Sequence, residues 1–166
     1  MTLADFTSPA LIVPHLHGHD AAAVIQELSR ALHRQNRILD LLLFYHTALN
    51  RELMVSTDME AGMAFPHARL ATLKELCFAF GRSDAPLAWG IRLGSAVRLV
   101  FLIAVPATDS TQHLALISGL TRLAMNSRLV EKLHAAQDTM QVMEVLNQVE
   151  LRTGSGPPAV RKETPC

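Results

Sequence analysis

The hydrophobic residues in the first third of this chain recur with the period of a helix. After Asp20, whose carboxylate can cap a helix N-terminus, apolar residues return every three or four positions as far as Gln35. A second segment of the same kind runs from Ile38 to about Leu53. The pattern therefore predicts two helices, followed by a loop over residues 55–62.

Short apolar runs farther along have the composition of strands. They lie at 11–13, at 63–67, at 76–80 before Gly81, and at 97–105. The run at 97–105 is almost uniformly apolar, which is typical of a central strand covered on both faces. Pro14 ends the first run, so we expect an edge strand there. Each of these runs is bounded by turn residues.

The last third returns to the helical period. The sequence predicts one helix after Pro106 and two shorter helices with N-caps at Ser127 and Asp138. Helices, strands and helices in this order predict a single α/β domain, with a mixed β-sheet flanked by helices on both faces. We assign residues 1–151 to this domain and residues 152–166, rich in glycine and proline, to a disordered C-terminal tail.

Composition and charge narrow the possible partners. The 166 residues include fifteen acidic and fifteen basic side chains, for a formal net charge of zero. This balance gives no electrostatic reason to expect nucleic acid or an anionic membrane as a partner. The N-terminus does not combine a basic region with an apolar one, so we expect no signal peptide, and no apolar run is long enough to span a bilayer. We expect a cytoplasmic protein without direct membrane insertion.

His67 lies in the segment A-F-P-H-A-R, residues 64–69. Two interpretations remain open from the pattern alone: a packed histidine at the end of a strand, or a nucleophile. Pro66 fixes its own φ and restricts the residue before it to extended geometry. The imidazole is therefore held with little backbone freedom, as a nucleophile requires.

Two more residues have the chemistry to assist a nucleophile. His113 is predicted in the first turn of the helix after the central strand, where helix amides and the dipole favour an anion. Arg51 carries a guanidinium that can hold phosphoryl oxygens through two parallel hydrogen bonds. The alternatives are an exposed helix residue for His113 and an unremarkable surface pair for Arg51 and Glu52.

Three alternate histidines, His15, His17 and His19, invite a metal interpretation, because alternate residues of an extended chain face the same way. However, no carboxylate or cysteine has the spacing of a zinc framework. We therefore expect neither a metal site nor a cofactor, and we set aside a histidine-rich metal hydrolase for want of carboxylate ligands.

The stretch from Arg51 to Arg69 resembles the signature of one family, the fructose–mannitol class of enzyme IIA domains of the bacterial phosphotransferase system, which includes a nitrogen-regulatory branch. The matching pieces are Arg51-Glu52, Ser56-Thr57, Gly62 and residues 64–69, followed in order by A-P-L-A-W, R-L-V-F-L-I-A-V-P and H-L-A-L-I-S-G-L. The resemblance covers the chain from about residue 5 to about residue 150. It implies that His67 is phosphorylated, that His113 lies beside it and that Arg51 assists.

The resemblance also implies a function. The chain would be a phosphotransferase component, a phosphohistidine carrier that accepts a phosphoryl group from the histidine phosphocarrier protein. It would pass this group to a IIB sugar-transport domain or use its phosphorylation state as a regulatory signal. The alternative is a non-catalytic regulatory binding module of the same fold, which controls a transporter or kinase.

The loop before the histidine departs from the family pattern. This loop usually reads Thr-Gly-Ile-Gly-Asn-Gly, whereas residues 57–62 read T-D-M-E-A-G. Asp58 and Glu60 therefore replace two glycines. If these acids lie near the phosphate, their charge is expected to slow phosphorylation of His67.

Overall fold

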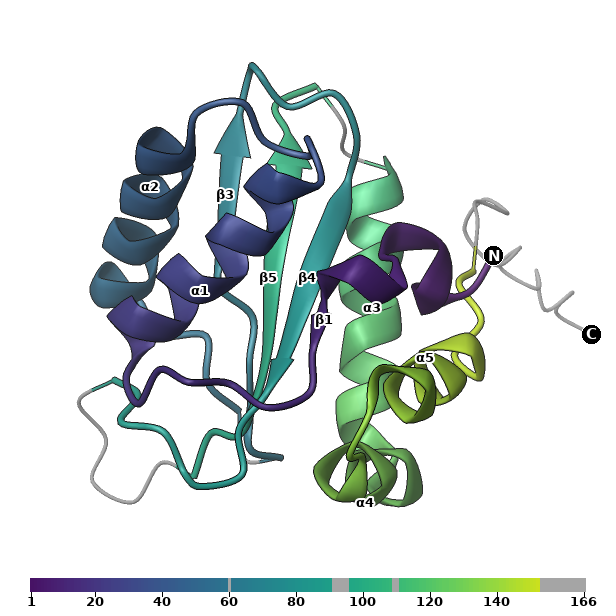
Figure 1. The fold of residues 1–166 in the computed structure, drawn as a ribbon. Helices are drawn as coiled ribbons and strands as arrows, with labels where there is room; N and C mark the ends of the chain where they lie inside the picture. Colours follow the sequence, from purple (N-terminus) through teal and green to yellow (C-terminus); the bar gives the residue numbers. More distant parts are fainter. Residues whose placement is uncertain (60, 91–95, 109–110, 153–166) are drawn as a thin grey trace, which may run out of the picture.

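A computed structural model describes residues 1–59, 61–90, 96–108 and 111–152, and in it a mixed sheet lies between two layers of helices (Figure 1). The helices of one layer are α1 (Ala21–Arg34) and α2 (Leu41–Met54). Those of the other layer are α3 (Thr111–Met125), α4 (Ser127–Ala135) and α5 (Thr139–Asn147), with the 3₁₀ turn η1 (Leu3–Phe6) beside them. A second 3₁₀ turn, η2 (Pro9–Leu11), contacts both α1 and α5. The predicted α/β fold class is confirmed.

The sheet has five strands, with β5 at its centre. They are β1 (Ile12–Val13), β2 (Met63–Ala64), β3 (His67–Leu70), β4 (Cys77–Arg82) and β5 (Leu99–Pro106). The order is β1–β4–β5, with β2 and β3 both paired along the far edge of β5. Only the β4–β5 pair is antiparallel among these. All eight β5 residues are buried, which confirms the predicted central strand, and β1 lies at the predicted edge.

Two hydrophobic cores cover the two faces of the sheet, and strand alternation assigns each residue to one of them. Along β5, Phe101 and Ile103 belong to the core under α3, α4 and α5, whereas Val100 belongs to the core under α1 and α2. On β3, Ala68 belongs to the core under α1 and α2. His67 and Arg69, on either side of it, therefore face the layer that contains α3.

Helix capping follows the predictions in part. Asp20 accepts a hydrogen bond from the amide of Ala23, and Asp138 caps α5 in the same way. The second helix begins at Leu41 rather than near Ile38 because Asp40 is its cap. The predicted cap at Ser127 is wrong by one residue, since the side chain of Asn126 accepts from the amide of Leu129. These caps explain where the helices begin.

The predicted strand at 63–67 is wrong, because the segment forms two strands. Phe65 and Pro66 separate β2 from β3, and Pro66 has no N–H to offer a neighbouring strand. The carbonyl of Pro66 nevertheless accepts a hydrogen bond of 2.9 Å from the amide of Ile103. His67 therefore begins a strand instead of ending one.

The strand predicted to end before Gly81 instead continues as β4 to Arg82. Gly81 lies inside the strand because Leu16 packs against it, and a Cβ at this position would lie 2.6 Å from a methyl carbon of Leu16. The glycine thus marks a close approach rather than a strand end.

The two ends of the described chain are joined by backbone hydrogen bonds. The amide of Leu3 donates to the carbonyl of Val149 and that of Leu151 to the carbonyl of Met1. The predicted tail lies outside the described residues from 153 onward. Within the part of the chain that is described, no helix has the length and apolar character needed to cross a membrane.

Candidate functional site

His67, at the start of β3, is half-buried, and its Nδ1 lies 3.2 Å from the carbonyl oxygen of Phe65. A carbonyl can only accept, so in the neutral ring Nδ1 carries the hydrogen and Nε2 keeps the lone pair. The ring of Phe65 stacks on Phe101 at a centroid distance of 5.5 Å, and Pro66 restrains the backbone between Phe65 and His67. The site presents an imidazole of fixed tautomer.

His113 lies in the first turn of α3, and its ring centroid is 6.5 Å from that of His67. Its Nδ1 lies 3.1 Å from Nη2 of Arg69. A guanidinium can only donate, so Nδ1 of His113 accepts and Nε2 carries the ring hydrogen. The structure therefore brings the two histidines together with opposite tautomers, one with a lone pair on Nε2 and one with an N–H there.

Arg69 is a residue that sequence reasoning did not single out for the site. It appears in the segment Pro-His-Ala-Arg, but its partner His113 is 44 positions away in the sequence. The signal that could have identified it is the strand period, because Arg69 is two residues from His67 and on the same face.

Arg51 lies exposed in the last turn of α2, a helix that packs against β3. Among the described residues its side chain makes no hydrogen bond and no ion pair, and no polar contact links it to His67 or His113. Its part in holding a phosphoryl group stays a prediction.

Glu52, beside the exposed Arg51, is buried, with 5% of its surface exposed. Its Oε1 accepts from the indole N–H of Trp89 and from the amide of Thr57, both at 2.8 Å. The hydroxyl of Thr57 lies 2.9 Å from Oε2 and accepts in turn from the amide of Phe65 at 2.8 Å. The sequence contains Glu52 and Thr57 at the spacing of the family signature, but nothing in it connects Glu52 with Trp89.

Asp58 lies in the loop that follows α2. It accepts a hydrogen bond of 2.6 Å from the hydroxyl of Ser56, and both line a groove of about 760 Å³ between the start of α1 and the end of α2. Glu60, the other acid of this loop, lies outside the described residues. The expected electrostatic effect of the two acids on His67 stays a prediction.

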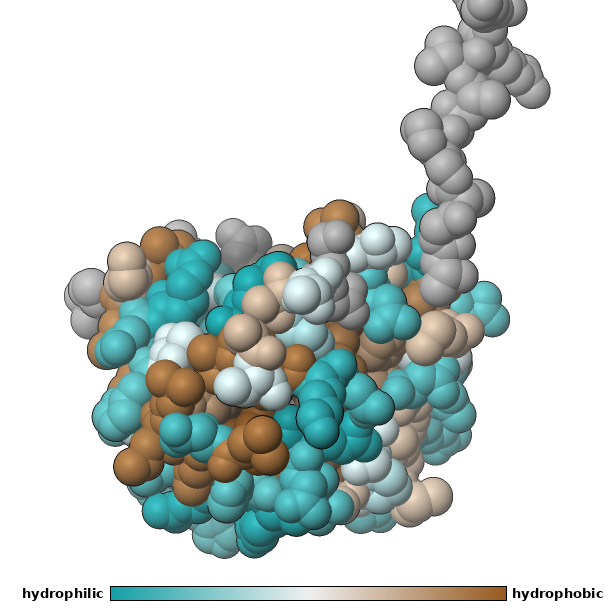
Figure 2. Space-filling view, turned by 90° about the horizontal axis from the view of Figure 1, so that it is seen from above, coloured by the Kyte–Doolittle hydropathy of each residue, from teal (hydrophilic) through white to brown (hydrophobic). Residues whose placement is uncertain are grey.

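Figure 2 shows the end of the molecule at which β3 and β5 finish and α3 begins. Brown apolar side chains gather on this face among teal polar ones. Leu114, which follows His113 in α3, is 70% exposed. The polar pair formed by His113 and Arg69 thus has an exposed apolar neighbour.

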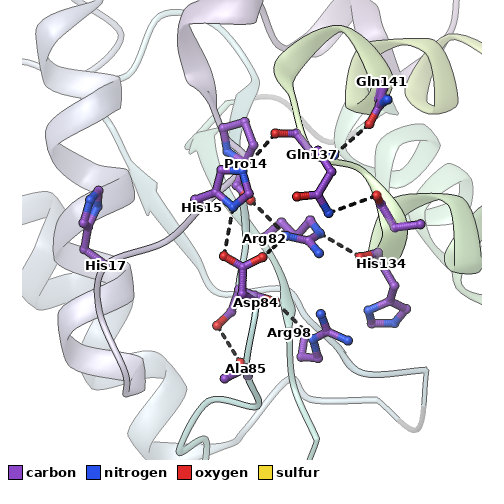
Figure 3. A network of polar contacts seen from close by, with 12 residues as sticks. Pro14, His15, His17, Arg82, Asp84, Ala85, Arg98, His134, Gln137 and Gln141 are labelled. Carbon is purple, nitrogen blue, oxygen red and sulfur yellow. Dashed lines mark hydrogen bonds and ion pairs between the residues drawn. The ribbon is translucent and has the colours of Figure 1, made fainter.

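The N-terminal histidines have separate partners (Figure 3). Nδ1 of His15 lies 2.9 Å from the carboxylate of Asp84, and Nε2 lies 2.9 Å from the carbonyl of Gln137. Both partners accept, so the protonated ring satisfies both, and they raise the pKa of His15. His17 points away from this pair and contacts Glu27. Within the described ranges, no three His, Cys, Asp or Glu side chains are placed to hold a metal ion.

Arg82 connects the His15 contacts to the core (Figure 3). The guanidinium is almost fully buried and donates to Asp84 at 2.6 Å and to the backbone carbonyls of Pro14 and His134. Asp84 therefore holds Arg82 and His15 at once, and both lower its pKa, Arg82 more than His15. These histidine contacts tie together the loops around β1, β4 and α5.

Comparison with known proteins identifies one family. The family profile described as phosphoenolpyruvate-dependent sugar phosphotransferase system, EIIA 2, matches residues 5–149. The chain is similar to a nitrogen regulatory protein of Bradyrhizobium diazoefficiens, with 29% identity over 149 residues that cover 88% of this chain and 95% of that protein.

Solved structures with the same fold are also found. The crystal structure of the nitrogen regulatory protein IIA-Ntr from Neisseria meningitidis has a TM-score of 0.76 and 24% identity, over 87% of this chain and 98% of that chain. The complex of the mannitol enzyme IIA with phosphorylated enzyme IIB from Escherichia coli has a TM-score of 0.72 and 17% identity, over 84% of this chain and 95% of that chain. At these identities the likeness establishes the fold alone.

Proposed function

The chain belongs to the EIIA 2 family of the phosphoenolpyruvate-dependent sugar phosphotransferase system, and we propose that His67 is the residue through which it carries a phosphoryl group. Domains of this family are phosphotransferase components that transfer phosphoryl groups through a histidine. The observation that carries the proposal is the hydrogen bond from Nδ1 of His67 to the carbonyl of Phe65. It leaves Nε2 as the nucleophilic atom of a neutral ring.

In the proposed step, the lone pair on Nε2 of His67 forms a bond to the phosphorus of a phosphohistidine donor. The bond between phosphorus and the donor nitrogen breaks, and its electron pair returns to the donor ring. Nδ1 of His67 keeps its hydrogen, so His67 becomes a phosphorylated imidazolium. The donor ring, protonated on its other nitrogen before transfer, leaves as neutral imidazole. The hydrogen bond to Phe65 strengthens as positive charge develops on His67.

His113 is placed to stabilise the transferred group. Its Nε2–H can donate to a phosphoryl oxygen, and a centroid distance of 6.5 Å leaves room for that group between the two rings. Arg69 fixes the donating tautomer of His113 and adds positive charge nearby. Because the transition state of phosphoryl transfer is loose, such positioning and charge stabilisation provide most of the catalysis. We assign Arg51 the same kind of role as an exposed cation.

We infer that the donor is the histidine phosphocarrier protein and the acceptor a IIB domain. The mannitol enzyme IIA, which shares this fold, forms a complex with phosphorylated enzyme IIB. Such partners imply a cytoplasmic location. A second function, regulation of a transporter or kinase by the phosphorylation state or by binding alone, is favoured by the nitrogen regulatory relative and by the acidic residues Asp58 and Glu60.

The test is phosphorylation of the purified protein by phosphoenolpyruvate, enzyme I and the phosphocarrier, followed by intact mass. The expected product carries one phosphoryl group, and His67→Ala carries none. Addition of a IIB domain then separates the two functions, because a transport component loses the group to it and a regulatory protein retains it. Full phosphorylation of His67→Ala would overturn the assignment.

A further inference from the structure

A chain of hydrogen bonds connects the buried carboxylate of Glu52 to the turn that precedes His67. The hydroxyl of Thr57 lies 2.9 Å from Oε2 of Glu52, and its oxygen accepts from the amide of Phe65 at 2.8 Å. A threonine hydroxyl has one hydrogen, which goes to the carboxylate, so its lone pair is left for Phe65. The direction of each hydrogen bond is therefore fixed.

The backbone of Phe65 is held on both sides of its Cα. Its N–H donates to Thr57, and its carbonyl accepts from Nδ1 of His67. The phenyl ring stacks on Phe101 at an interplanar angle of 26°, and Pro66 limits the following backbone. Rotation of Phe65 would break both hydrogen bonds at once. The position of the carbonyl that selects the His67 tautomer thus depends on the hydroxyl of Thr57.

On the basis of the function proposed for His67, we propose that Glu52 is a positioning residue for the phosphoryl transfer. Through Thr57 and Phe65 it holds the carbonyl that keeps the ring hydrogen of His67 on Nδ1 and the lone pair on Nε2. Glu52 acts through two intervening residues, so it is not a catalytic residue.

The charge of Glu52 contributes as well as its shape. A carboxylate has only acceptor atoms, and Oε1 collects two groups that can only donate, the indole N–H of Trp89 and the amide of Thr57. In a buried site such a carboxylate polarises the Thr57 hydroxyl and strengthens the bond that this hydroxyl accepts from Phe65. The Thr57 hydroxyl lies 2.9 Å from Oε2 and 3.0 Å from Oε1. A glutamine at position 52 keeps one acceptor oxygen, which the hydroxyl would have to share with the indole and the Thr57 amide, and its NH₂ group cannot accept.

A purely architectural role also accounts for the burial of Glu52, because its carboxylate joins the end of α2 to Trp89 and to the loop after the helix. Three variants separate the two roles. Thr57→Val keeps the side-chain shape and removes the hydroxyl, whereas Thr57→Ser keeps the hydroxyl. Ser56→Ala is the control for the loop: Ser56 bonds Asp58 at 2.6 Å and has only a long contact of 3.4 Å with Oε1 of Glu52, and it bonds neither Thr57 nor Phe65.

The experiment measures two quantities for each variant: the ring ¹⁵N chemical shifts of His67, which report its tautomer, and the single-turnover rate of phosphorylation by phosphoramidate. This small donor needs no docking surface. We expect the Nδ1–H tautomer and similar rates in wild type, Ser56→Ala and Thr57→Ser. Thr57→Val and Glu52→Gln should show a mixture of tautomers and rates lower by about ten- to a hundredfold, the size of effect that follows when a group orienting a metal-bound histidine is removed.

The outcomes distinguish the two roles of Glu52. The proposal is overturned if Thr57→Val keeps both the tautomer and the rate of wild type. It is also overturned if the phosphorylation rate falls as much in Thr57→Ser as in Thr57→Val. Thermal unfolding checks that each variant folds, and Glu52→Gln replaces Thr57→Val in the comparison should the latter not fold. If wild type is not phosphorylated while Thr57→Val and Glu52→Gln still change the tautomer, the proposed function fails, and the network is shown to set the His67 tautomer but not to serve phosphoryl transfer.

The single tryptophan of the chain gives an independent readout of the same network. The indole N–H of Trp89 donates to Glu52, so its ¹H chemical shift depends on the carboxylate. We expect this resonance to move in Glu52→Gln and to move much less in Ser56→Ala, which removes only a 3.4 Å contact with the same oxygen. An unchanged resonance in Glu52→Gln would show that the carboxylate does not hold the indole, which would contradict the network.

Discussion

Nη2 of Arg69 lies 3.1 Å from Nδ1 of His113, so a guanidinium on β3 selects the tautomer of an imidazole on α3. Phe65 selects the opposite tautomer for His67 through its carbonyl. The two histidines thus receive complementary chemical roles from the groups that their Nδ1 atoms contact, although both belong to the same residue type.

Replacement of Arg69 by methionine should slow phosphorylation of His67 by roughly tenfold, at the low end of the effect of removing a group that orients a metal-bound histidine. The physical reason is that His113 loses the donor that keeps its hydrogen on Nε2. The measurement is the single-turnover rate together with the ring ¹⁵N shifts of His113. Arg128→Met, on the exposed face of α4, is the control. Unchanged His113 shifts in Arg69→Met would refute this role.

Replacement of His113 by alanine removes a donor to the developing phosphoryl charge. Loss of one such donor typically lowers the rate by about 10²–10³, while the partly exposed position should leave unfolding temperature nearly unchanged. His113→Gln keeps a neutral donor and should retain part of the rate. Phosphorylation of His67 is expected to be slow in Arg51→Ala for the same reason. Wild-type rates in both alanine variants would show that these residues do not act with His67.

The acids before the histidine should act as an electrostatic brake. Two extra negative charges oppose a phosphoryl dianion, and exposed charges within about 10 Å still interact at 0.1 M salt. The double variant Asp58→Gly with Glu60→Gly should therefore be phosphorylated faster than wild type, most clearly at low ionic strength. A rate series over salt concentration with one donor is the measurement. Equal phosphorylation rates of wild type and the double variant at every salt concentration would show that these acids do not slow phosphorylation.

The contacts of His15 should make stability depend on pH. The Asp84 carboxylate and the Gln137 carbonyl raise the pKa of His15 above its ordinary value of 6.5. Its stabilisation is therefore fully present below that value and is lost as pH rises through the folded pKa. Asp84, with a lowered pKa, keeps its contribution until pH falls through its own folded pKa. Wild type should unfold at a higher temperature than His15→Gln.

The pH profile of that difference is the decisive part of the His15 measurement. The higher unfolding temperature of wild type should be present at about pH 5, where Asp84 is ionised and His15 protonated. It should be absent at about pH 9, where the His15 ring is neutral. His17→Gln is the control, because His17 is exposed and its ion pair among the described residues is with Glu27, not with Asp84. A difference that persists unchanged at about pH 9 would contradict a charged His15.

The local elements of this fold could be predicted from the sequence because they depend on nearby residues. Asp20 and Asp138 cap helices through amides three positions away, and the apolar run of β5 indicates a strand covered on both faces. The break at Pro66 was not predicted because residues 63–67 have a continuous strand-like composition. The missing N–H of proline interrupts the strand only because this segment pairs with β5, and the sequence does not show that pairing.

The interactions of the candidate site are harder to predict because they join distant parts of the chain. His67 and His113 are identified by chemistry and by resemblance, but Arg69 meets His113 across 44 positions and Trp89 meets Glu52 across 37. Helical and strand periods carry no information about such pairs. Glu52 follows Arg51 directly, yet one side chain is exposed and the other is buried, which only the packing of α2 decides.

The most direct test of the account is to identify the atom that carries the phosphoryl group. Protein labelled with ¹⁵N in its histidine rings is phosphorylated and kept in alkali, where a phosphoramidate is stable, and the ¹⁵N–³¹P coupling is measured by NMR. We expect a single phosphoryl group on Nε2 of His67, lost in acid and absent from His67→Ala. Phosphorus bonded to Nδ1 of His67, to another histidine or to an acid-stable site would contradict it.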